Sequence, residues 1–177
     1  EGIHSRTDFD LSNHENFSSK QIKYFDPFDE KKYTPYVIET SIGLDRMFLA
    51  VFSQSLNIEK LSDGTERTVL KIPKILASNK CAIFPLVKKD GLPEIASSLK
   101  DQLKLKYNVI YDEKDAIGKR YRRQDAIGTP YCITIDHQTT EDNTVTIRHR
   151  DSMVQERIPI ENIESFLSQS LDISNWL

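Results

Sequence analysis

The stretch YVIETSIGLDRMFLAVF, residues 36–52, joins a strand-like run to a strongly apolar run through one glycine. Val37 and Ile38 are β-branched and apolar, which is typical of a buried strand. Leu44 begins a run that we expect to be helical, and Gly43 before it would allow a tight backbone turn. The stretch therefore predicts a strand, a turn and a helix in immediate succession.

Arg46 falls in the first turn of this expected helix. A cation there lies close to the partial positive charge of the helix start, which costs up to about 1 kcal/mol unless an anion binds nearby. Glu39 and Ser41 end the strand just before this position. The pattern indicates a site for an anionic ligand. The competing interpretation is an ordinary junction in which Arg46 extends into solvent or pairs with Asp45 or Glu39.

Length and charge limit the possible functions. The chain has 177 residues, 24 of them basic and 27 acidic, with a net charge of −3. A nucleic-acid site must therefore be a local patch on one of one or two domains. Cys81 and Cys132 lie in apolar runs and should be buried free thiols. The four histidines lack the spacing of metal ligands, so no metal site is predicted.

No apolar run is long enough to span a bilayer, and the N-terminus lacks a signal-peptide pattern, so we expect a cytoplasmic protein without a membrane partner. The first residue is Glu1 rather than Met, which suggests a fragment or a processed chain.

The second half of the chain alternates apolar runs with helical patterns. A helix should open at Leu92, another should contain IGKRYRRQDAIG, and a last one should cover residues 160–171. The strands are expected at residues 81–87, 108–111, 131–135, 144–148 and 154–158. Such a βαβαβ order predicts an α/β module with a largely parallel sheet, whose last two strands form an antiparallel hairpin near an edge.

The first half has weaker patterns. Residues 1–35 are polar and rich in turns, and FDPFDEKKY should be a turn between short strands. Asp63 and Gly64 mark a second turn, and Pro73 would stop any helix over residues 66–71. We place a domain boundary at residue 77, which gives domains of residues 1–77 and 78–177.

A basic cluster occupies the helix expected in IGKRYRRQDAIG. Four cations fall in five positions, Lys119, Arg120, Arg122 and Arg123, with Tyr121 between them. Such a cluster suits phosphates, and an aromatic ring can stack on an unpaired base. The alternative is a solvated face whose arginine stems cover apolar surface.

Two motifs carry a resemblance to a known family. ETSIGLDR resembles motif 3 of the class II aminoacyl-tRNA synthetases, in the form E-T/P-S-x-G-x-D-R of the glycyl-tRNA synthetase family, and GIHSRTDFDL resembles the segment before it. The run AIGKRYRRQDAIGTPYCITID, residues 116–136, is similar to the anticodon-binding domain shared by the glycyl, histidyl, prolyl and threonyl enzymes. Ala116 stands where that pattern has Ser.

The resemblance covers essentially the whole chain and implies its fold. Residues 1–77 would be the end of a class II catalytic domain, with an antiparallel sheet and the strand and helix of motif 3. Residues 78–177 would be an α/β anticodon-binding domain with a mixed, mostly parallel sheet flanked by helices.

The resemblance also implies a function, that of a glycine–tRNA ligase. Such an enzyme condenses glycine with ATP to glycyl-adenylate, releases pyrophosphate and passes the glycyl group to tRNA(Gly). Mg²⁺ is expected with ATP, and a homodimer is expected for the full-length enzyme. Motifs 1 and 2 are not found in this chain, so by itself it should hold only part of the active site and be inactive.

Site residues follow by the same resemblance. Arg46 would bind the ATP phosphates and Glu39 would hold the glycine ammonium, both as catalytic residues. Ser41 would line the glycine pocket. The substrate-binding set is Glu39, Thr40, Ser41, Ile42 and Gly43; the ATP-binding set is Gly43, Leu44, Asp45 and Arg46; the tRNA-binding set is Lys119, Arg120, Arg122, Arg123, Arg148 and Arg150.

Three points stay open. Arg148 and Arg150 point to one side of a strand and His149 to the other, so the arginines would either fork onto an RNA base or phosphate or pair with Glu156 or Asp151. Arg6 and Asp8 are either site-lining residues or paired surface charges. A non-catalytic nucleic-acid-binding accessory protein with a synthetase-like fold is the alternative function, and the intact residues Glu39, Ser41 and Arg46 argue against it.

Overall fold

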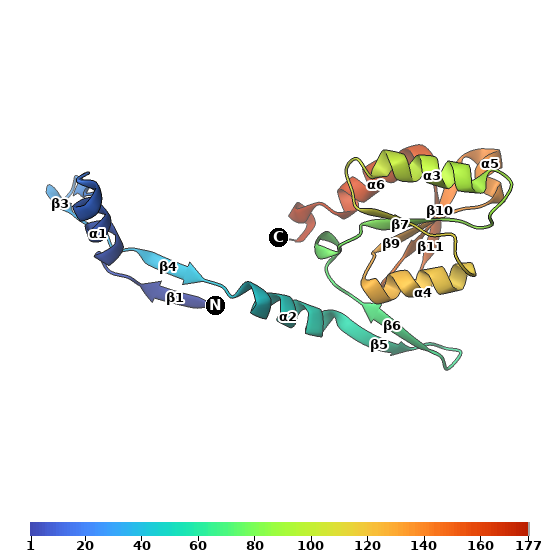
Figure 1. Ribbon diagram of the computed structural model, residues 1–177, viewed down its shortest axis with the longest axis horizontal. Helices are drawn as coiled ribbons and strands as arrows, with labels where there is room; N and C mark the ends of the chain where they lie inside the picture. Colours follow the sequence, from blue (N-terminus) through green and yellow to red (C-terminus); the bar gives the residue numbers. More distant parts are fainter. Residues whose placement is uncertain (177) are drawn as a thin grey trace. The chain divides into compact units, whose positions relative to one another are not determined.

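The computed structural model describes residues 1–176 and divides into two compact units, Glu1–Ala50 and Val51–Leu177 (Figure 1). Helix α2 (Leu44–Ser55) runs across this division. The helix expected from Leu44 is thereby confirmed. No helix within residues 1–176 is both long enough and apolar enough to cross a membrane.

The first unit is built from short elements. Strand β1 (Gly2–Ser5) pairs antiparallel with β4 (Ile38–Ser41), and helix α1 (Phe9–Ser18) lies between them in the sequence. Strands β2 (Tyr24–Asp26) and β3 (Lys31–Tyr33) form the hairpin that FDPFDEKKY predicted. Helix α1 was not predicted, because its apolar residues show no helical period.

None of residues 1–50, all of which the structure describes, is buried. The prediction of a buried strand at Val37 and Ile38 is therefore wrong in its burial: Ile38 begins β4 and is 64% exposed. The turn at Gly43 also differs from expectation. Its φ angle is not in the left-handed region, so the backbone does not demand glycine there.

The second unit begins with an antiparallel hairpin of β5 (Leu56–Lys60) and β6 (Glu66–Leu70). The turn at Gly64 is confirmed, with φ of 79°. The possibility of a helix over residues 66–71 is wrong, because Arg67 and Val69 alternate inward with a strand's period of two. This hairpin packs on a helix of the second unit, so the unit starts at Val51; the predicted domain boundary at residue 77 stays a prediction.

A five-stranded mixed sheet lies at the centre of the second unit. Its order is β11 (Gln155–Pro159), β10 (Thr144–His149), β9 (Tyr131–Ile135), β7 (Cys81–Pro85) and β8 (Val109–Tyr111). Strand β7 is parallel to β8 and β9, whereas β10 is antiparallel to β9 and β11. The α/β fold with a late hairpin at the edge is confirmed.

Helices cover both faces of this sheet (Figure 1). Helices α3 (Leu92–Leu103), α5 (His137–Asp142) and α6 (Ile163–Ser170) lie on one face, and α4 (Ile117–Ile127) lies on the other. Short 3₁₀ turns occur at Lys74–Leu76, Ile160–Asn162 and Ile173–Trp176. The main core fills the α3 and α6 side, with residues such as Ile83, Ile133 and Leu167 fully buried.

Cys81 and Cys132 are buried free thiols, as expected. Burial raises the pKa of Cys81 to about 12 and also raises that of Cys132. Neither thiol is therefore ionised near neutral pH.

Candidate functional site

The joint between β4 and α2 forms a small pocket in the first unit. Its volume is about 310 Å³, and its lining comprises Glu1, Gly2, Ser41, Ile42, Gly43, Arg46 and Met47. The structure thus brings Ser41, Ile42, Gly43 and Arg46 together, as predicted from the sequence. Thr40, Leu44 and Asp45 are near in sequence but do not line this pocket.

Arg46 is exposed and makes no hydrogen bond or ion pair with any residue in the range 1–176. Pairing with Asp45 or Glu39 is not seen, whereas the other part of the competing interpretation, that Arg46 extends into solvent, agrees with its exposure. A Cβ atom added at Gly43 would lie 3.6 Å from the Arg46 Cδ atom, an ordinary contact. Because Gly43 has no side chain, there is open space at the start of the helix beside the unpaired guanidinium group of Arg46. An anion can bind in this space.

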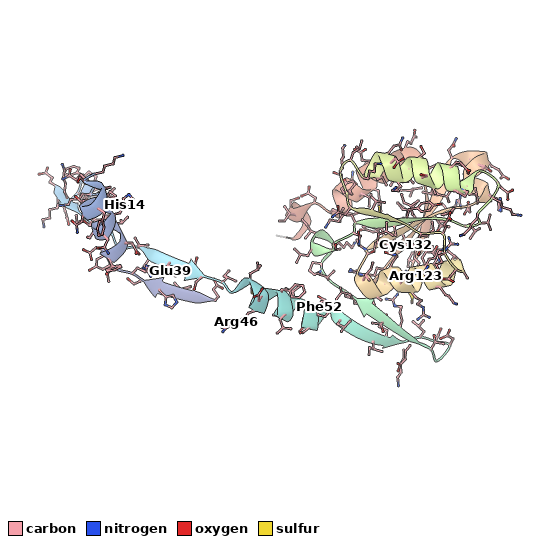
Figure 2. The ribbon with its side chains drawn as sticks, in the orientation of Figure 1. His14, Glu39, Arg46, Phe52, Arg123 and Cys132 are labelled. Carbon is pink, nitrogen blue, oxygen red and sulfur yellow. The ribbon has the colours of Figure 1, made fainter. Side chains whose placement is uncertain are left out.

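Glu39 lies on β4 outside this pocket (Figure 2). Its carboxylate is 3.2 Å from the guanidinium of Arg6, which also forms two hydrogen bonds to Asp10, of 2.5 and 2.8 Å. Those hydrogen bonds hold the pKa of Asp10 below its usual range. Asp8 instead accepts a hydrogen bond from Ser12. Arg6 is therefore a partner of Glu39 rather than of Asp8.

The basic helix α4 uses most of its cations within the fold. Arg120 is buried and donates to the backbone oxygens of Asp115 and Pro85. Arg123 donates to Asp112 and Asp115, and thereby holds the preceding loop (labelled in Figure 2). Burial opposes ionisation of Asp112, but the hydrogen bonds from Arg123 and the Lys114 amide, together with the charges of Arg123 and Arg120, lower its pKa.

Two cations of α4 remain closer to solvent. Arg122 is half-buried and donates to the Glu66 backbone oxygen at 2.8 Å, which attaches the β5–β6 hairpin to α4. Lys119 is exposed and makes no hydrogen bond or ion pair with the residues that the structure describes. Lys119 is thus the member of the predicted cluster most accessible to a phosphate.

Arg148 of β10 and Arg150 in the turn after it share one side, as their spacing predicted, and the structure shows that this side faces α4. Arg148 donates two hydrogen bonds to Asp125, of 2.8 and 3.0 Å, and Arg150 donates to Asp151 and to the Gly128 backbone oxygen. Both arginines are buried. The predicted rival, pairing with Asp151, therefore holds for Arg150.

His149 points to the opposite face, where it contacts Glu156 at 2.6 Å. A base-reading role for Arg148 or Arg150 would require these internal pairs to open.

Tyr121 also differs from its expected role. Its hydroxyl is 2.7 Å from the hydroxyl of Thr134, its ring contacts Phe84 edge-on, and the Arg148 guanidinium lies 4.9 Å from the ring centre. Burial raises its pKa. The ring forms part of the fold on the α4 side and is not free to stack on a base.

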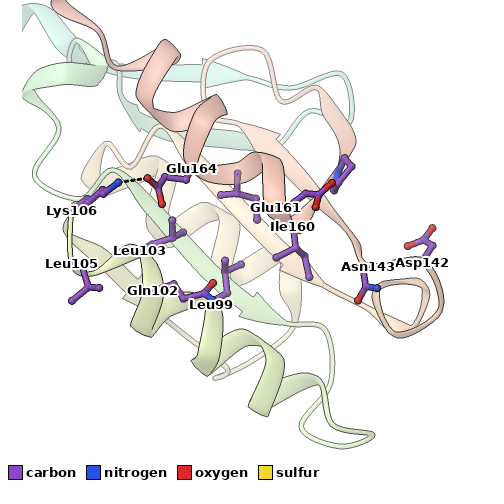
Figure 3. A pocket seen from close by; sticks show the side chains of 12 residues that line it. Leu99, Gln102, Leu103, Leu105, Lys106, Asp142, Asn143, Ile160, Glu161 and Glu164 are labelled. Carbon is purple, nitrogen blue, oxygen red and sulfur yellow. Dashed lines mark hydrogen bonds and ion pairs between the residues drawn. The ribbon is translucent and has the colours of Figure 1, made fainter.

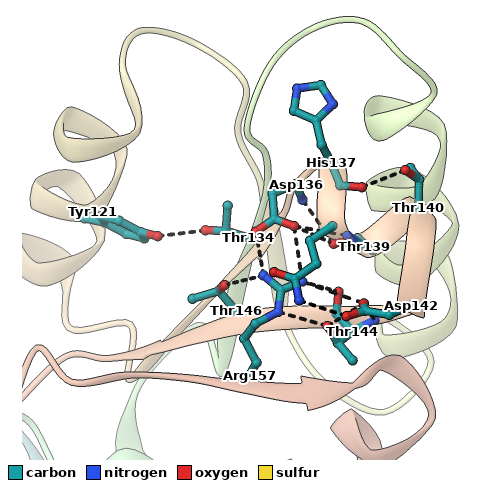
Figure 4. Close-up of polar contacts among 11 residues, drawn as sticks. Tyr121, Thr134, Asp136, His137, Thr139, Thr140, Asp142, Thr144, Thr146 and Arg157 are labelled. Carbon is teal, nitrogen blue, oxygen red and sulfur yellow. Dashed lines mark hydrogen bonds and ion pairs between the residues drawn. The ribbon is translucent and has the colours of Figure 1, made fainter.

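A row of polar residues on the same side of the sheet was missed by the sequence reasoning (Figure 4). Thr134 pairs with Thr146 across the strands, and Thr146 pairs with Arg157. The period of two in TVTIR and ITID could have revealed this row, because residues two apart share a face of a sheet. The hydroxyl groups of this row are hydrogen-bonded within the fold, Thr134 to Tyr121 and Thr146 to Arg157.

Arg157, the last member of this row, forms an ion pair with Asp136 (Figure 4). The guanidinium donates to both carboxylate oxygens, at 2.7 and 3.2 Å, and to the Thr144 hydroxyl at 2.9 Å. Asp136 also caps α5 through the Thr139 amide. Burial tends to raise the pKa of Asp136, but the hydrogen bonds from Arg157 and Thr139 outweigh it and lower that pKa.

A cavity of about 900 Å³ lies on the other face of the sheet, between α3 and the start of α6 (Figure 3). Its lining includes Leu99, Leu103 and Ile163, with Glu161 and the ion pair of Lys106 with Glu164 at its rim. None of the predicted site residues lines it. Its carboxylates also disfavour a phosphate-rich ligand.

A family model for the anticodon binding domain matches residues 80–170, more than half of the chain. The chain therefore belongs to the family of anticodon-binding domains. The mixed sheet with α4 on one face and α3 and α6 on the other is the part of the chain that carries this match.

Three similar relatives are named glycine–tRNA ligase. The protein from Chlorobaculum tepidum is 48% identical over 171 residues, which are 97% of this chain and 36% of that protein. Those from Borreliella burgdorferi strain B31 and Clostridium beijerinckii are 49% and 50% identical, again over 97% of this chain, and are covered to 39% and 36%. The chain spans 36 to 39% of the length of these relatives.

The resemblance predicted from the two motifs is confirmed by these relatives. Among solved structures, prolyl-tRNA synthetase from Cryptosporidium parvum, complexed with L-proline and AMP, matches with a TM-score of 0.53 and 23% identity. The match covers 58% of this chain and 22% of that one. At this identity the likeness establishes the fold alone.

Proposed function

We propose that the chain is part of a glycine–tRNA ligase, an ATP-dependent enzyme that activates glycine and transfers it to tRNA(Gly). The observation that carries the proposal is the identity of 48 to 50% to proteins of that name over 97% of the chain. The unpaired Arg46 beside an open pocket supports it from the geometry.

The β4–α2 joint would serve the activation of glycine. In that step the glycine carboxylate attacks the α-phosphorus of ATP and pyrophosphate leaves, which places negative charge where Arg46 can bind it. Ser41 would line the glycine pocket, and Glu39 would bind the α-ammonium, held in place by Arg6 at 3.2 Å. Because glycine has no side chain to bind, selection must come from excluding larger amino acids and from charge partners of the ammonium.

The exposed apolar surface of the first unit fits a role in a larger active site. Leu44, Phe48 and Leu49 on α2 are between 62% and 81% exposed, and a helix so apolar is normally covered. We propose that the remainder of a longer protein covers α2 and supplies the other residues that bind ATP. The isolated chain would then have no activating function.

The second unit would bind the anticodon stem and loop of the tRNA. Lys119, Arg122 and Arg123 remain our proposed phosphate contacts. Lys119 is exposed, whereas Arg122 and Arg123 are half-buried and would have to leave their partners in the fold to bind a phosphate. Arg120, Arg148 and Arg150 are used inside the fold, so we assign them the support of this face rather than direct contacts with RNA.

The other family expectations stay proposals. We propose a homodimer and a cytoplasmic location for the full-length protein. Among residues 1–176, no group of three or more His, Cys, Asp or Glu side chains is placed to hold a metal ion. Mg²⁺, which the family resemblance implies, would enter together with ATP.

The test uses glycine-dependent exchange of pyrophosphate into ATP by the full-length protein. Glu39→Gln removes the ionic partner of the ammonium and keeps the size of the side chain. We expect the KM for glycine to rise by about 10-fold or more, because a hydrogen bond to a charged group contributes roughly 1.5 to 3 kcal/mol. The KM for ATP should stay within twofold.

Two results would contradict the proposal. A rise in the KM for ATP without a change for glycine would make Glu39 a residue of the ATP site or of the fold. An absence of any glycine-dependent exchange in the unaltered full-length protein would favour the accessory nucleic-acid-binding protein.

A further inference from the structure

A buried ionic cluster joins three elements of the second unit at Asp125. This residue of α4 is fully buried and receives Arg148 from β10 and Arg67 from β6. Arg67 is also fully buried, and Arg148 is nearly so. Because buried charges are stable only when paired, the three side chains depend on one another.

The two arginines bind the carboxylate differently. Arg148 donates to both oxygens, at 2.8 and 3.0 Å, whereas Arg67 makes one contact of 3.4 Å through Nη1. The Nε and Nη2 atoms of Arg67 have no hydrogen bond within the residues described, although Nη2 lies 2.9 Å from the Glu59 carboxylate. Asp125 thus fixes Arg148 firmly and holds Arg67 loosely.

Arg148 in turn supports the side of the sheet that α4 covers. Its guanidinium lies 4.9 Å from the ring centre of Tyr121, a cation–π contact, and the Tyr121 hydroxyl meets that of Thr134. Thr134 is the first member of the polar row that continues through Thr146 to Arg157. A displacement of Arg148 would therefore move one side of this row.

We propose that Asp125 is a positioning residue for RNA recognition, with Arg67 as the link between the β5–β6 hairpin and the α4 face. Asp125 sets the position of the Arg148–Tyr121 pair, and Arg67 makes that position depend on the hairpin. This inference rests on the proposed function. It adds that the specificity of the anticodon-binding face is set in part by charges that never contact RNA.

The experiment measures binding of the 177-residue chain to a tRNA(Gly) transcript and to the same transcript with a swapped anticodon, across a salt titration. Asp125→Asn keeps the shape of the side chain and removes its charge. We expect the preference for tRNA(Gly) to fall about 10-fold, the order of one well-placed base contact. The salt dependence should not change, because no phosphate contact is lost.

Arg67→Met tests the link from the hairpin while leaving the Asp125–Arg148 pair in place. We expect the preference for tRNA(Gly) to fall by about threefold, less than in Asp125→Asn, because Arg67 is only weakly coupled to Asp125. Lys60→Met is the matched control, because Lys60 is an exposed cation on the same hairpin. That control should keep the full preference.

The results separate the inference from the proposed function. If the unaltered chain shows no preference for tRNA(Gly), the proposed anticodon role fails. If it shows the preference and folded Asp125→Asn keeps it within twofold, the positioning role is wrong. If Asp125→Asn does not fold, Arg67→Met provides the test. An equal preference for tRNA(Gly) in Arg67→Met and Lys60→Met would contradict the proposed coupling of the Arg148–Tyr121 pair to the hairpin through Arg67.

Discussion

Arg46 of the first unit and the buried arginines of the second unit are used in opposite ways. In the first unit Arg46 stands unpaired beside a pocket, and no residue of 1–50 is buried. In the second unit Arg120, Arg148 and Arg150 are buried and paired in a domain with its own core. A basic residue in a motif can therefore either be available to bind a ligand or stabilise the fold. The burial of its side chain distinguishes these two roles.

The largest expected difference between the units is in the free energy of unfolding. Leu167→Ala in the core of α6 should lower the stability of the second unit by about 2 to 5 kcal/mol. Leu44→Ala at an 81% exposed position of α2 should change the stability of the chain by no more than about 0.5 kcal/mol. Urea unfolding followed by circular dichroism measures both. Similar losses would mean that α2 packs in the isolated chain.

The function of the unpaired arginine is the next test. In the full-length protein, Arg46→Ala should reduce glycine-dependent pyrophosphate exchange by about 10- to 100-fold, because a charge-assisted contact with phosphate contributes roughly 1.5 to 3 kcal/mol. The stability of the chain should not change. Lys20→Ala, which removes an exposed cation elsewhere in the first unit, is the control. Exchange within twofold of the unaltered enzyme would remove Arg46 from the ATP site.

Two glycines provide a matched pair. Gly128 ends α4 with φ of 84°, and a Cβ there would lie 3.0 Å from Ile72 and 3.1 Å from the Leu70 backbone oxygen. Gly128→Ala should therefore cost roughly 1 to 3 kcal/mol of stability. Gly43→Ala should cost little in the isolated chain, because its φ is ordinary and its surroundings are open. Thermal unfolding would contradict this account if Gly43→Ala were the more damaging change.

The smallest effect concerns pH. The lowered pKa of Asp136 means that its contribution to stability is complete above the unfolded value near 3.8 and is lost as the pH falls through the folded value. Asp136→Asn should therefore destabilise the chain at pH 7 and converge with the unaltered chain once the pH falls below the folded pKa of Asp136. Asp29→Asn, at an exposed position of the first unit, should follow the unaltered chain throughout. A constant difference at every pH would contradict the ionic origin.

The helices and strands that were predicted correctly are those whose apolar residues recur with a helical or strand period and are buried in the core of the second unit. Strand β9 was expected at its observed bounds, and helices α3 and α4 at theirs within a residue or two. Helix α1 was missed, because its apolar residues follow no helical period. The β5–β6 hairpin was missed apart from its turn, because a charged residue, Arg67, occupies one of its inward positions. The burial of Ile38 was overestimated. The apolar character of a residue indicates that it favours burial, but it does not show which part of the protein would bury it.

The candidate site was less predictable from sequence. The joint at Gly43 and Arg46 was located by its motif, since strand, glycine and helix start are neighbours in the chain. Ion pairs between distant residues, such as Arg67 and Arg148 with Asp125, leave no local pattern. Without the register of the sheet, those arginines could not be told from residues that contact RNA.

Amide hydrogen exchange of the 177-residue chain tests the central claim most directly, namely that the second unit is complete while the first needs surface that this chain does not supply. The account predicts strong protection in β7, β9 and β10, which make up the buried centre of the sheet, and little protection in β1, β4 and the first turns of α2. Protection of the β1–β4 pair equal to that of β9 would contradict it.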